Sequence, residues 1–182
     1  MARRLETRID GLALIEPEVH GDERGFLVES FRADKWRRLG VDVDFVQQNS
    51  SRSSRGTLRG LHFQTEPGQA KLVRCARGEI FDVAVDMRRA SPTFGQWEGH
   101  VLDDRAHHQL FLPVGFGHGF CVLSETADVS YQLSSYYDPP FEAGIAWDDP
   151  GIGIEWPIDD PLLSDRDRSA PRLADIADSL TF

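Results

Sequence analysis

Short segments rich in apolar and β-branched residues follow one another through most of the chain, from Phe45 to Leu133. Gly, Pro, Asn, Asp and Ser separate these segments, and no stretch with helical spacing comes between them. The clearest are Lys71–Ala76, Glu79–Asp86, Trp97–Leu102, Gln109–Leu112, Gly119–Leu123 and Ala127–Leu133. Many short strands at fairly even spacing predict an all-β fold, either a sandwich or a barrel.

The two ends of the chain carry the other predicted elements. Residues 8–19 open as a strand that stops at Pro17, residues 20–25 read as a turn-rich loop, and residues 26–31 read as a strand. Residues 34–39, followed by Gly40, predict a short helix, and residues 172–180 predict a weaker one. No repeat or linker divides the chain, so we expect one domain over residues 1–182. The residues predicted for the core or for the lining of the barrel include Phe26, Phe63, Phe81, Phe111 and Phe120.

One stretch of this pattern, Gly56–Gln64, combines a strand with candidate chemistry. Side chains alternate between the faces of a strand, so His62 shares a face with Gly60, whereas Arg59 points the other way. A bulge would bring Arg59 beside His62, and the glycines of the stretch permit one. Taken alone, a histidine on a strand is more often a hydrogen-bonded structural residue, so the remaining sequence has to decide its role.

The charge distribution narrows the class of ligand. A net charge of −10 argues against general binding to nucleic acid or to an anionic membrane. Within residues 52–77, however, Glu66 is the only acidic residue among several arginines and a lysine. This local basic patch suits a small anion such as a phosphorylated metabolite, although a solvated strand face would carry the same charges.

Other features of composition point to the cytoplasm. Cys75 and Cys121 lie in apolar runs, which is typical of reduced thiols in a core. No apolar run approaches the roughly 18 residues of a membrane span, and none follows the basic N-terminus as in a signal peptide. We therefore expect a cytoplasmic protein.

The spacings Gly56-x5-His62 and Pro113-x-Gly115-x2-His118 resemble the two halves of the cupin signature, which implies a small jelly-roll barrel with its site inside. Cupins that bind a metal carry a second histidine where this chain has Gln64. Two histidines and an amide are a poor ligand set for zinc or iron. We therefore expect a cupin-type jelly roll with short peripheral helices, and a site without metal or cofactor.

Histidine, lysine and tyrosine inside a barrel suggest acid–base chemistry. Histidine side chains can accept a proton at neutral pH. His62 is therefore a candidate base, but it can remove a proton from carbon only where a neighbouring carbonyl acidifies that carbon. Lys71 can stabilise the resulting enolate, and Tyr131 can return a proton on the opposite face. These residues make epimerisation beside a ketone plausible, but they do not distinguish it from isomerisation or racemisation.

Longer motifs carry a more specific resemblance. They are Gln47–Ser51, Gly56–Gln64, Gln69–Val73, Gly78–Asp86, Ser91–Gly95, Pro113–Phe120, Tyr131–Tyr137 and Trp147–Pro150. In this order, between about Ile9 and Leu173, they resemble the dTDP-4-dehydrorhamnose 3,5-epimerase family. The resemblance implies a cytosolic homodimer that inverts C3 and C5 of a dTDP-4-keto-6-deoxyhexose without a metal or cofactor.

The resemblance also implies roles for individual residues. His62 matches the family's catalytic base, and Asp167 matches the carboxylate that orients it, with Asp165 as a close rival. Tyr131 matches the proton donor, and Lys71 matches the residue near the keto oxygen. The other positions that match substrate-binding residues are Arg24, Glu29, Gln47, Asn49, Arg59, His118, Tyr137, Glu142 and Arg166. The last of these stands where the family usually has lysine, so a contact there would differ in reach and geometry.

Several alternatives stay open. Arg24 and Glu29 could form an exposed pair on a loop, and Tyr137 could be an ordinary buried aromatic residue. Relatives in antibiotic-sugar pathways epimerise a single carbon, and nothing in the sequence separates them from the two-carbon enzyme. A metal-dependent cupin oxygenase would need bound iron or zinc. A non-catalytic nucleotide-sugar binder would have no need of the whole catalytic set.

Overall fold

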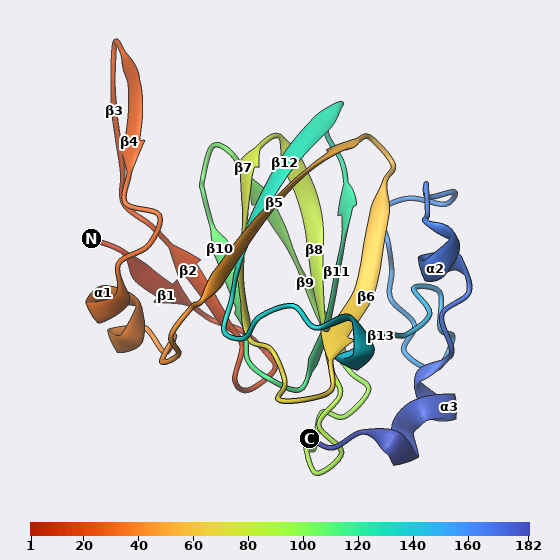
Figure 1. The fold of residues 1–182 in the computed structure, drawn as a ribbon. Helices are drawn as coiled ribbons and strands as arrows, with labels where there is room; N and C mark the ends of the chain where they lie inside the picture. Colours follow the sequence, from red (N-terminus) through yellow and green to blue (C-terminus); the bar gives the residue numbers. More distant parts are fainter.

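Two antiparallel sheets pack face to face in the computed structural model, which describes residues 1–182 (Figure 1). The six-stranded sheet has the order β1-β2-β10-β7-β12-β5, and the five-stranded sheet has the order β13-β6-β11-β8-β9. The first contains β1 (Arg3–Leu5), β2 (Ala13–Glu16), β5 (Gln47–Ser54), β7 (Lys71–Arg77), β10 (Gln109–Leu112) and β12 (Thr126–Leu133). The second contains β6 (Leu58–Gln64), β8 (Glu79–Asp86), β9 (Trp97–Asp103), β11 (Phe116–Val122) and β13 (Glu142–Gly144). The predicted all-β jelly-roll fold is confirmed.

The helices are short and lie outside the sheets, as predicted (Figure 1). They are α1 (Ala33–Arg38), α2 (Asp165–Arg168) and α3 (Leu173–Ile176), with 3-10 turns η1 (Pro139–Phe141) and η2 (Ala177–Ser179). Trp36 of α1 is buried against Leu72 and Phe111 on the outer face of the six-stranded sheet. No helix of the structure is both long and apolar enough to cross a membrane.

Apolar side chains fill part of the space between the two sheets. Alternation along β7 directs Val73 and Cys75 inward, where they join a cluster of 15 buried residues that also contains Ile80 and Phe120. Lys71 lies on the same inward face, two residues before Val73, and is also buried. The polar site therefore continues directly from the apolar core of the barrel.

The outer face of the five-stranded sheet is apolar as well, and the C-terminal segment covers it. Leu61, Phe63 and Val83 of the sheet pack against Leu173 and Leu180 of that segment. Because both faces of the sheet are covered, its two central strands, β8 and β11, are buried along nearly their whole length. Figure 1 shows the segment, with α2 and α3, beside β6. This covering brings α2 next to the strand that carries His62.

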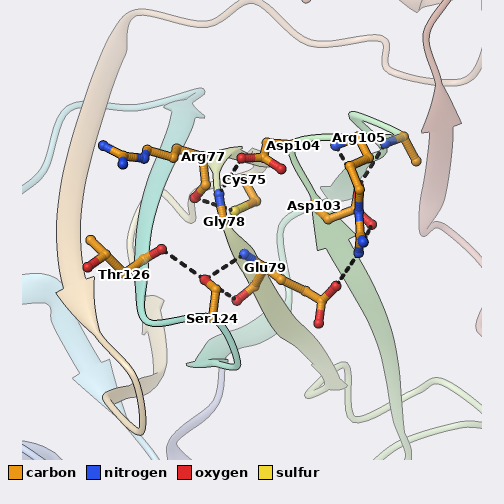
Figure 2. A network of polar contacts seen from close by, with 10 residues as sticks. Cys75, Arg77, Gly78, Glu79, Asp103, Asp104, Arg105, Ser124 and Thr126 are labelled. Atoms are coloured by element: carbon orange, nitrogen blue, oxygen red, sulfur yellow. Dashed lines mark hydrogen bonds and ion pairs between the residues drawn. The ribbon is translucent and has the colours of Figure 1, made fainter.

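A polar network holds three chain reversals at one end of the barrel (Figure 2). The carboxylate of Asp104 accepts a hydrogen bond from the backbone N–H of Gly78 at 2.7 Å. The hydroxyl of Ser124 accepts one from the N–H of Glu79 at 2.8 Å and donates one to the carbonyl of Thr126 at 2.8 Å. The connections β7–β8, β9–β10 and β11–β12 are thereby tied together, which fixes the register of the strands that line the interior.

Two predictions for the N-terminal part are wrong. The predicted loop at residues 20–25 lies largely in β3 (Val19–Asp22), which pairs with β4 (Gly25–Val28) in a hairpin that stands away from both sheets (Figure 1). Phe26, predicted for the core, lies on this hairpin and is 58% exposed. Phe63, Phe111 and Phe120 are buried as predicted, and Phe81 is half-buried. The hairpin buries neither face in this chain, so no apolar alternation marks its strands.

Candidate functional site

A cavity of about 630 Å³ opens between the two sheets, and we call it the main cavity. Strands β5, β6, β7, β11 and β12 supply much of its wall. Residues between 162 and 167, Glu142 of β13 and the loop residues Thr57, Gln69 and Tyr137 supply the rest. Its lining includes ten of the thirteen predicted site residues, namely Asn49, Arg59, His62, Lys71, His118, Tyr131, Tyr137, Glu142, Arg166 and Asp167. Side chains that are more than a hundred positions apart in the sequence therefore meet in the main cavity.

His62 and Asp167 form a close polar contact in the cavity. The Nε2 atom of His62, in β6, lies 2.6 Å from the Oδ1 atom of Asp167, in α2. Ser164 caps this helix by accepting a hydrogen bond from the N–H of Asp167 at 3.1 Å. Asp167 is only 5% exposed, whereas its rival Asp165 is exposed to solvent. The geometry thus brings Asp167, and not Asp165, to the imidazole.

The Asp167 carboxyl stays ionised despite its burial. Burial alone would raise its pKa, but the hydrogen bond and charge of His62, with the contact to Ser164, outweigh that effect and hold the pKa below its usual value. An ionised carboxylate accepts a hydrogen bond and cannot donate one. It therefore favours the tautomer of His62 that carries its proton on Nε2 and leaves Nδ1 as the basic nitrogen.

The strand that carries His62 has the expected bulge. His62 lies opposite His118 of β11, but beyond that pair β6 contains one extra residue before the register resumes at Arg59. Gly60 sits in this irregular stretch with φ +134°, and a Cβ there would come 2.4 Å from the Cα of Gly119. Only glycine fits this close approach. As a result, Arg59 and His62 both line the main cavity.

Lys71 and Arg59 provide positive charge that no carboxylate neutralises by direct contact. The Lys71 ammonium donates a hydrogen bond to the backbone carbonyl of His62 at 3.1 Å. The Arg59 guanidinium donates one to the hydroxyl of Ser53 at 3.1 Å. Burial lowers the pKa of Lys71 to about 8, so the residue is mostly protonated at neutral pH and can lose its proton in mildly alkaline solution.

Sequence reasoning missed one residue of the site, Asp82. It lies in β8, is fully buried, and approaches the Nε2 atom of His118 to 2.8 Å through its Oδ1 atom. The alternation of side chains along this strand could have identified Asp82, because Ile80 and Ala84 point into the apolar core and Asp82 stands between them. A carboxylate at an inward position of an apolar strand needs a partner, and the histidine supplies it. Both histidines that line the cavity, His62 and His118, are thus paired with an aspartate, and of the two aspartates only Asp167 lines the cavity itself.

Tyr137, Glu142 and Arg166 form a second polar group at the rim. The Tyr137 hydroxyl and the Arg166 guanidinium both donate to the Oε2 atom of Glu142, each at 2.6 Å. Tyr137 is 46% exposed, so it is not an ordinary buried aromatic residue. Gln47 does not line the cavity, but its amide accepts a hydrogen bond from the Tyr137 N–H at 2.9 Å and donates one to Asn49 at 3.0 Å.

Arg24 and Glu29 lie outside the main cavity of their own chain. Arg24 is in the turn of the β3–β4 hairpin and pairs with Asp22, and Glu29 pairs with Lys35 at 2.6 Å. The two residues therefore do not form the exposed pair with each other that the sequence left open. Within one chain, both residues are held by partners that lie outside the cavity as well.

Gln64, at the position of the second cupin histidine, does not line the main cavity. Its amide accepts a hydrogen bond from the N–H of Asp138 at 3.1 Å and donates to Ser135 and to the carbonyl of Tyr136. The side chain thus anchors the loop that presents Tyr137.

Fold and site together define a class of protein, a jelly roll with an acid–base site between its sheets. Two histidines, each paired with an aspartate, line one cavity of that site together with a lysine and a tyrosine. The family model of dTDP-4-dehydrorhamnose 3,5-epimerase matches residues 6–175. The chain belongs to this family.

Individual relatives agree with the family model. The chain is 50% identical to the dTDP-4-dehydrorhamnose 3,5-epimerase of Methanothermobacter thermautotrophicus over 170 residues, which cover 92% of each chain. It is also 50% identical to the enzyme of Shigella flexneri, over 94% of this chain and 96% of that one. Among solved structures, it resembles dTDP-6-deoxy-D-glucose-3,5-epimerase from Legionella pneumophila in complex with dTDP-4-keto-L-rhamnose. That match has a TM-score of 0.93 and 47% identity, and covers 96% of this chain and 94% of the other.

Proposed function

We propose that this chain is an isomerase that inverts C3 and C5 of dTDP-4-keto-6-deoxyglucose, giving dTDP-4-keto-rhamnose. The observation that carries the proposal is the His62–Asp167 pair, which faces Tyr131 and Lys71 across one cavity. Family membership supplies the substrate class. The reaction is redox-neutral, since each carbon loses one proton and gains one, and our proposal includes no metal or cofactor.

The two walls of the main cavity suit inversion. His62 belongs to β6 of the five-stranded sheet, and Tyr131 belongs to β12 of the six-stranded sheet, so a sugar between the sheets has one residue on each side. In the proposed step, Nδ1 of His62 removes the proton beside the C4 ketone. The C–H electron pair moves into an enolate, whose oxygen Lys71 stabilises. Tyr131 then donates a proton to the opposite face of the carbon and recovers its own from solvent.

The remaining lining residues suit the nucleotide. We propose that Arg59 binds the diphosphate, because its guanidinium lines the cavity and bonds only to an uncharged hydroxyl. Tyr137 is half-exposed at the rim and is proposed to stack on the thymine, with Gln47 and Asn49 beside it. Glu142 and Arg166 would hold Tyr137 in place, and His118 would contact the sugar.

Arg24 and Glu29 can bind substrate only if a second chain brings them to the site. We propose a homodimer in which the β3–β4 hairpin of one protomer reaches the cavity of its partner. The hairpin projects from the barrel and exposes Phe26 and Leu27, and exposed apolar side chains of this size are typical of an interface. We also propose a cytoplasmic location, which the free, buried thiol of Cys75 supports.

The direct test is the configuration of the product. Purified protein is incubated with dTDP-4-keto-6-deoxyglucose, the 4-keto group is reduced chemically, and the hexose is identified by NMR. Sugars inverted at C3 and C5 are expected. Inversion at C3 alone would assign the chain to the single-centre epimerases, and an unchanged sugar would contradict the proposal.

A further inference from the structure

The β3–β4 hairpin has few attachments to the rest of its own chain. Its two strands pair only with each other, and no hydrogen bond or ion pair connects residues 19–28 to the two large sheets or to α1. A cavity of about 380 Å³ is lined both by Leu27 and Val28 of β4 and by Trp36 of α1, so the hairpin is not packed closely onto this helix. A two-stranded hairpin is only marginally stable without packing. Its position therefore depends on the few contacts that remain.

One of these contacts joins Phe26 of the hairpin to His107, in the loop between β9 and β10. The centroids of the two rings are 4.5 Å apart, and the rings are tilted by 40°. Phe26 pairs with Gly21 near the turn of the hairpin, two residues after Arg24. The contact thus acts near the tip of the hairpin and not at its base, where it restrains the direction of the hairpin most effectively.

A tight turn holds His107 in place. The Oδ1 atom of Asp103 accepts hydrogen bonds from the backbone N–H groups of Arg105 and Ala106, at 2.8 and 2.7 Å. The N–H of His107 itself donates to the carbonyl of Asp103 at 3.1 Å. Because Asp103 is the last residue of β9, this turn connects the imidazole firmly to the barrel.

The conformation of His107 is unfavourable locally. It is the only residue other than glycine with a positive φ, at +55°, and side chains with a Cβ rarely adopt this region. The residue is 3% exposed, yet its Nδ1 atom has no hydrogen-bond partner, which adds a desolvation cost. Residues kept in such conformations cluster at functional positions, and the aromatic partner of this ring is Phe26 of the hairpin.

From these contacts we infer that His107 is a positioning residue, which holds the β3–β4 hairpin in the direction that brings Arg24 into the site of the partner protomer. The inference rests on the proposed function and on the homodimer proposed with it. Without the imidazole, the hairpin would sample several directions, and only a fraction of the protein would be competent to bind substrate. The apparent affinity for substrate falls by that fraction. The chemical step uses other residues, so it should not be affected.

His107→Asn removes the ring and keeps the backbone, since asparagine tolerates a positive φ. We expect the KM for dTDP-4-keto-6-deoxyglucose to rise about fivefold, the factor that corresponds to an ordinary aromatic contact, and kcat to stay within about twofold. His108→Asn is the matched control, because this neighbouring imidazole lies 3.6 Å from Glu16 and not on the hairpin. Its KM should not change. His107→Gly, which also accepts this φ, replaces His107→Asn if the latter does not fold.

Mixing of subunits separates positioning of the hairpin from a structural effect on the chain's own cavity. His107→Asn protein is exchanged with about a tenfold excess of inactive His62→Ala protein, so that most His107→Asn chains enter hybrid dimers. The intact cavity of such a hybrid receives its hairpin from the His62→Ala chain, whose His107 is unaltered. We expect the KM of the hybrid to return to that of the unaltered protein. A KM that stays raised would overturn the inference, because His107 would then act on its own cavity.

Phe26→Ala removes the other partner of the contact. The double variant of Phe26→Ala and His107→Asn should have the same KM as Phe26→Ala alone, because either change removes the one contact. Independent, multiplying increases in KM would overturn the inference.

Arg24→Ala distinguishes failure of the inference from failure of the proposal on which it rests. If Arg24→Ala has the KM and kcat of the unaltered protein, the hairpin does not serve the site, and the proposed homodimer and the inference both fail. If Arg24→Ala is impaired but folded His107→Asn has an unchanged KM, only the inference is overturned.

Discussion

The contact between His62 and Asp167 determines which nitrogen of the imidazole can act as the base. Asp167 comes from a helix of only four residues, yet Ser164 caps that helix and the carboxylate is buried. A single hydrogen bond of 2.6 Å therefore links the C-terminal segment to the chemistry proposed for the barrel.

Asp167→Asn keeps the shape of this contact but removes its charge. We expect kcat to fall on the order of 10²-fold or more with little change in KM, because an amide does not hold the imidazole in the required tautomer or stabilise its charged form. Steady-state kinetics of product formation measures the effect. Asp165→Asn is the control, since that exposed side chain does not contact His62, and it should retain near-normal kcat. Equal losses in the two variants would refute the role given to Asp167.

Lys71 should give the reaction an alkaline limit. With its pKa lowered to about 8 by burial, the protonated fraction falls from about nine-tenths at pH 7 to about one-tenth at pH 9. Because the proposed enolate needs this positive charge, kcat/KM should decline through pH 8. Lys71→Gln should be much less active and should lack this decline. A profile of the unaltered protein that stays flat to pH 9.5 would contradict the assignment.

The pH dependence of stability distinguishes the expected decline in kcat/KM from unfolding of the protein. The usual pKa of lysine, 10.5, lies above the folded value of about 8, so the unfolded chain binds more protons than the folded one between these values. The contribution of Lys71 to the free energy of unfolding therefore rises with pH in that window. Activity should decline there without a loss of stability attributable to this residue.

At the scale of elements, the bulge in β6 is the feature that sequence reasoning anticipated best. The alternation of a regular strand places Arg59 and His62 on opposite faces, and the glycines between and before them suggested a distortion. The structure has that distortion at Gly60, where the backbone of β11 leaves no room for a side chain. The conformational freedom of glycine was enough to predict the bulge, because Arg59, Gly60 and His62 lie within four positions of the sequence.

Gly60→Ala tests this account of the bulge. Its Cβ would lie 2.4 Å from the Cα of Gly119, in a backbone conformation with φ +134°. We expect the free energy of unfolding in urea to fall by roughly 3 kcal/mol or more. Gly153→Ala is the control, because φ there is +68° but no atom lies within 4 Å of the added methyl group. Its cost should be about 1 kcal/mol. Similar losses in both variants would show that the close approach of β6 and β11 is not what requires glycine.

The features that sequence reasoning missed have two physical causes. The β3–β4 hairpin buries no face in its own chain, so its strands carry no apolar alternation, and the turn-forming residues dominated the interpretation. Asp82 was overlooked because its partner, His118, lies 36 residues away and becomes its neighbour only through the pairing of β8 with β11. The pairing of Asp167 with His62 could be anticipated only from the resemblance to a family, since their separation is 105 residues.

At the scale of the whole molecule, the β3–β4 hairpin and the main cavity each carry part of the proposed substrate-binding set, and the two lie apart within one chain. Arg24 is exposed at the hairpin turn, whereas His62 lies between the sheets. In a homodimer with twofold symmetry, each site would contain His62 from one protomer and Arg24 from the other. This arrangement makes a prediction that a site within a single chain does not.

Hybrid dimers distinguish the two arrangements. His62→Ala and Arg24→Ala proteins, each of low activity, are mixed in equal amounts under conditions that allow subunits to exchange. If the site is shared, one site of every hybrid has both residues intact, and about a quarter of all sites regain activity. If each chain contributes both residues to its own site, mixing restores nothing. The two variants assayed without exchange are the control.

The central claim is that His62 removes a proton from carbon beside the keto group, and solvent deuterium tests it most directly. The protein is incubated with dTDP-4-keto-6-deoxyglucose in deuterated water, and deuterium at C3 and C5 is measured by NMR. We predict deuterium at both carbons with the unaltered protein and at neither with His62→Ala. Deuterium at neither carbon with the unaltered protein, or full incorporation with His62→Ala, would contradict the account.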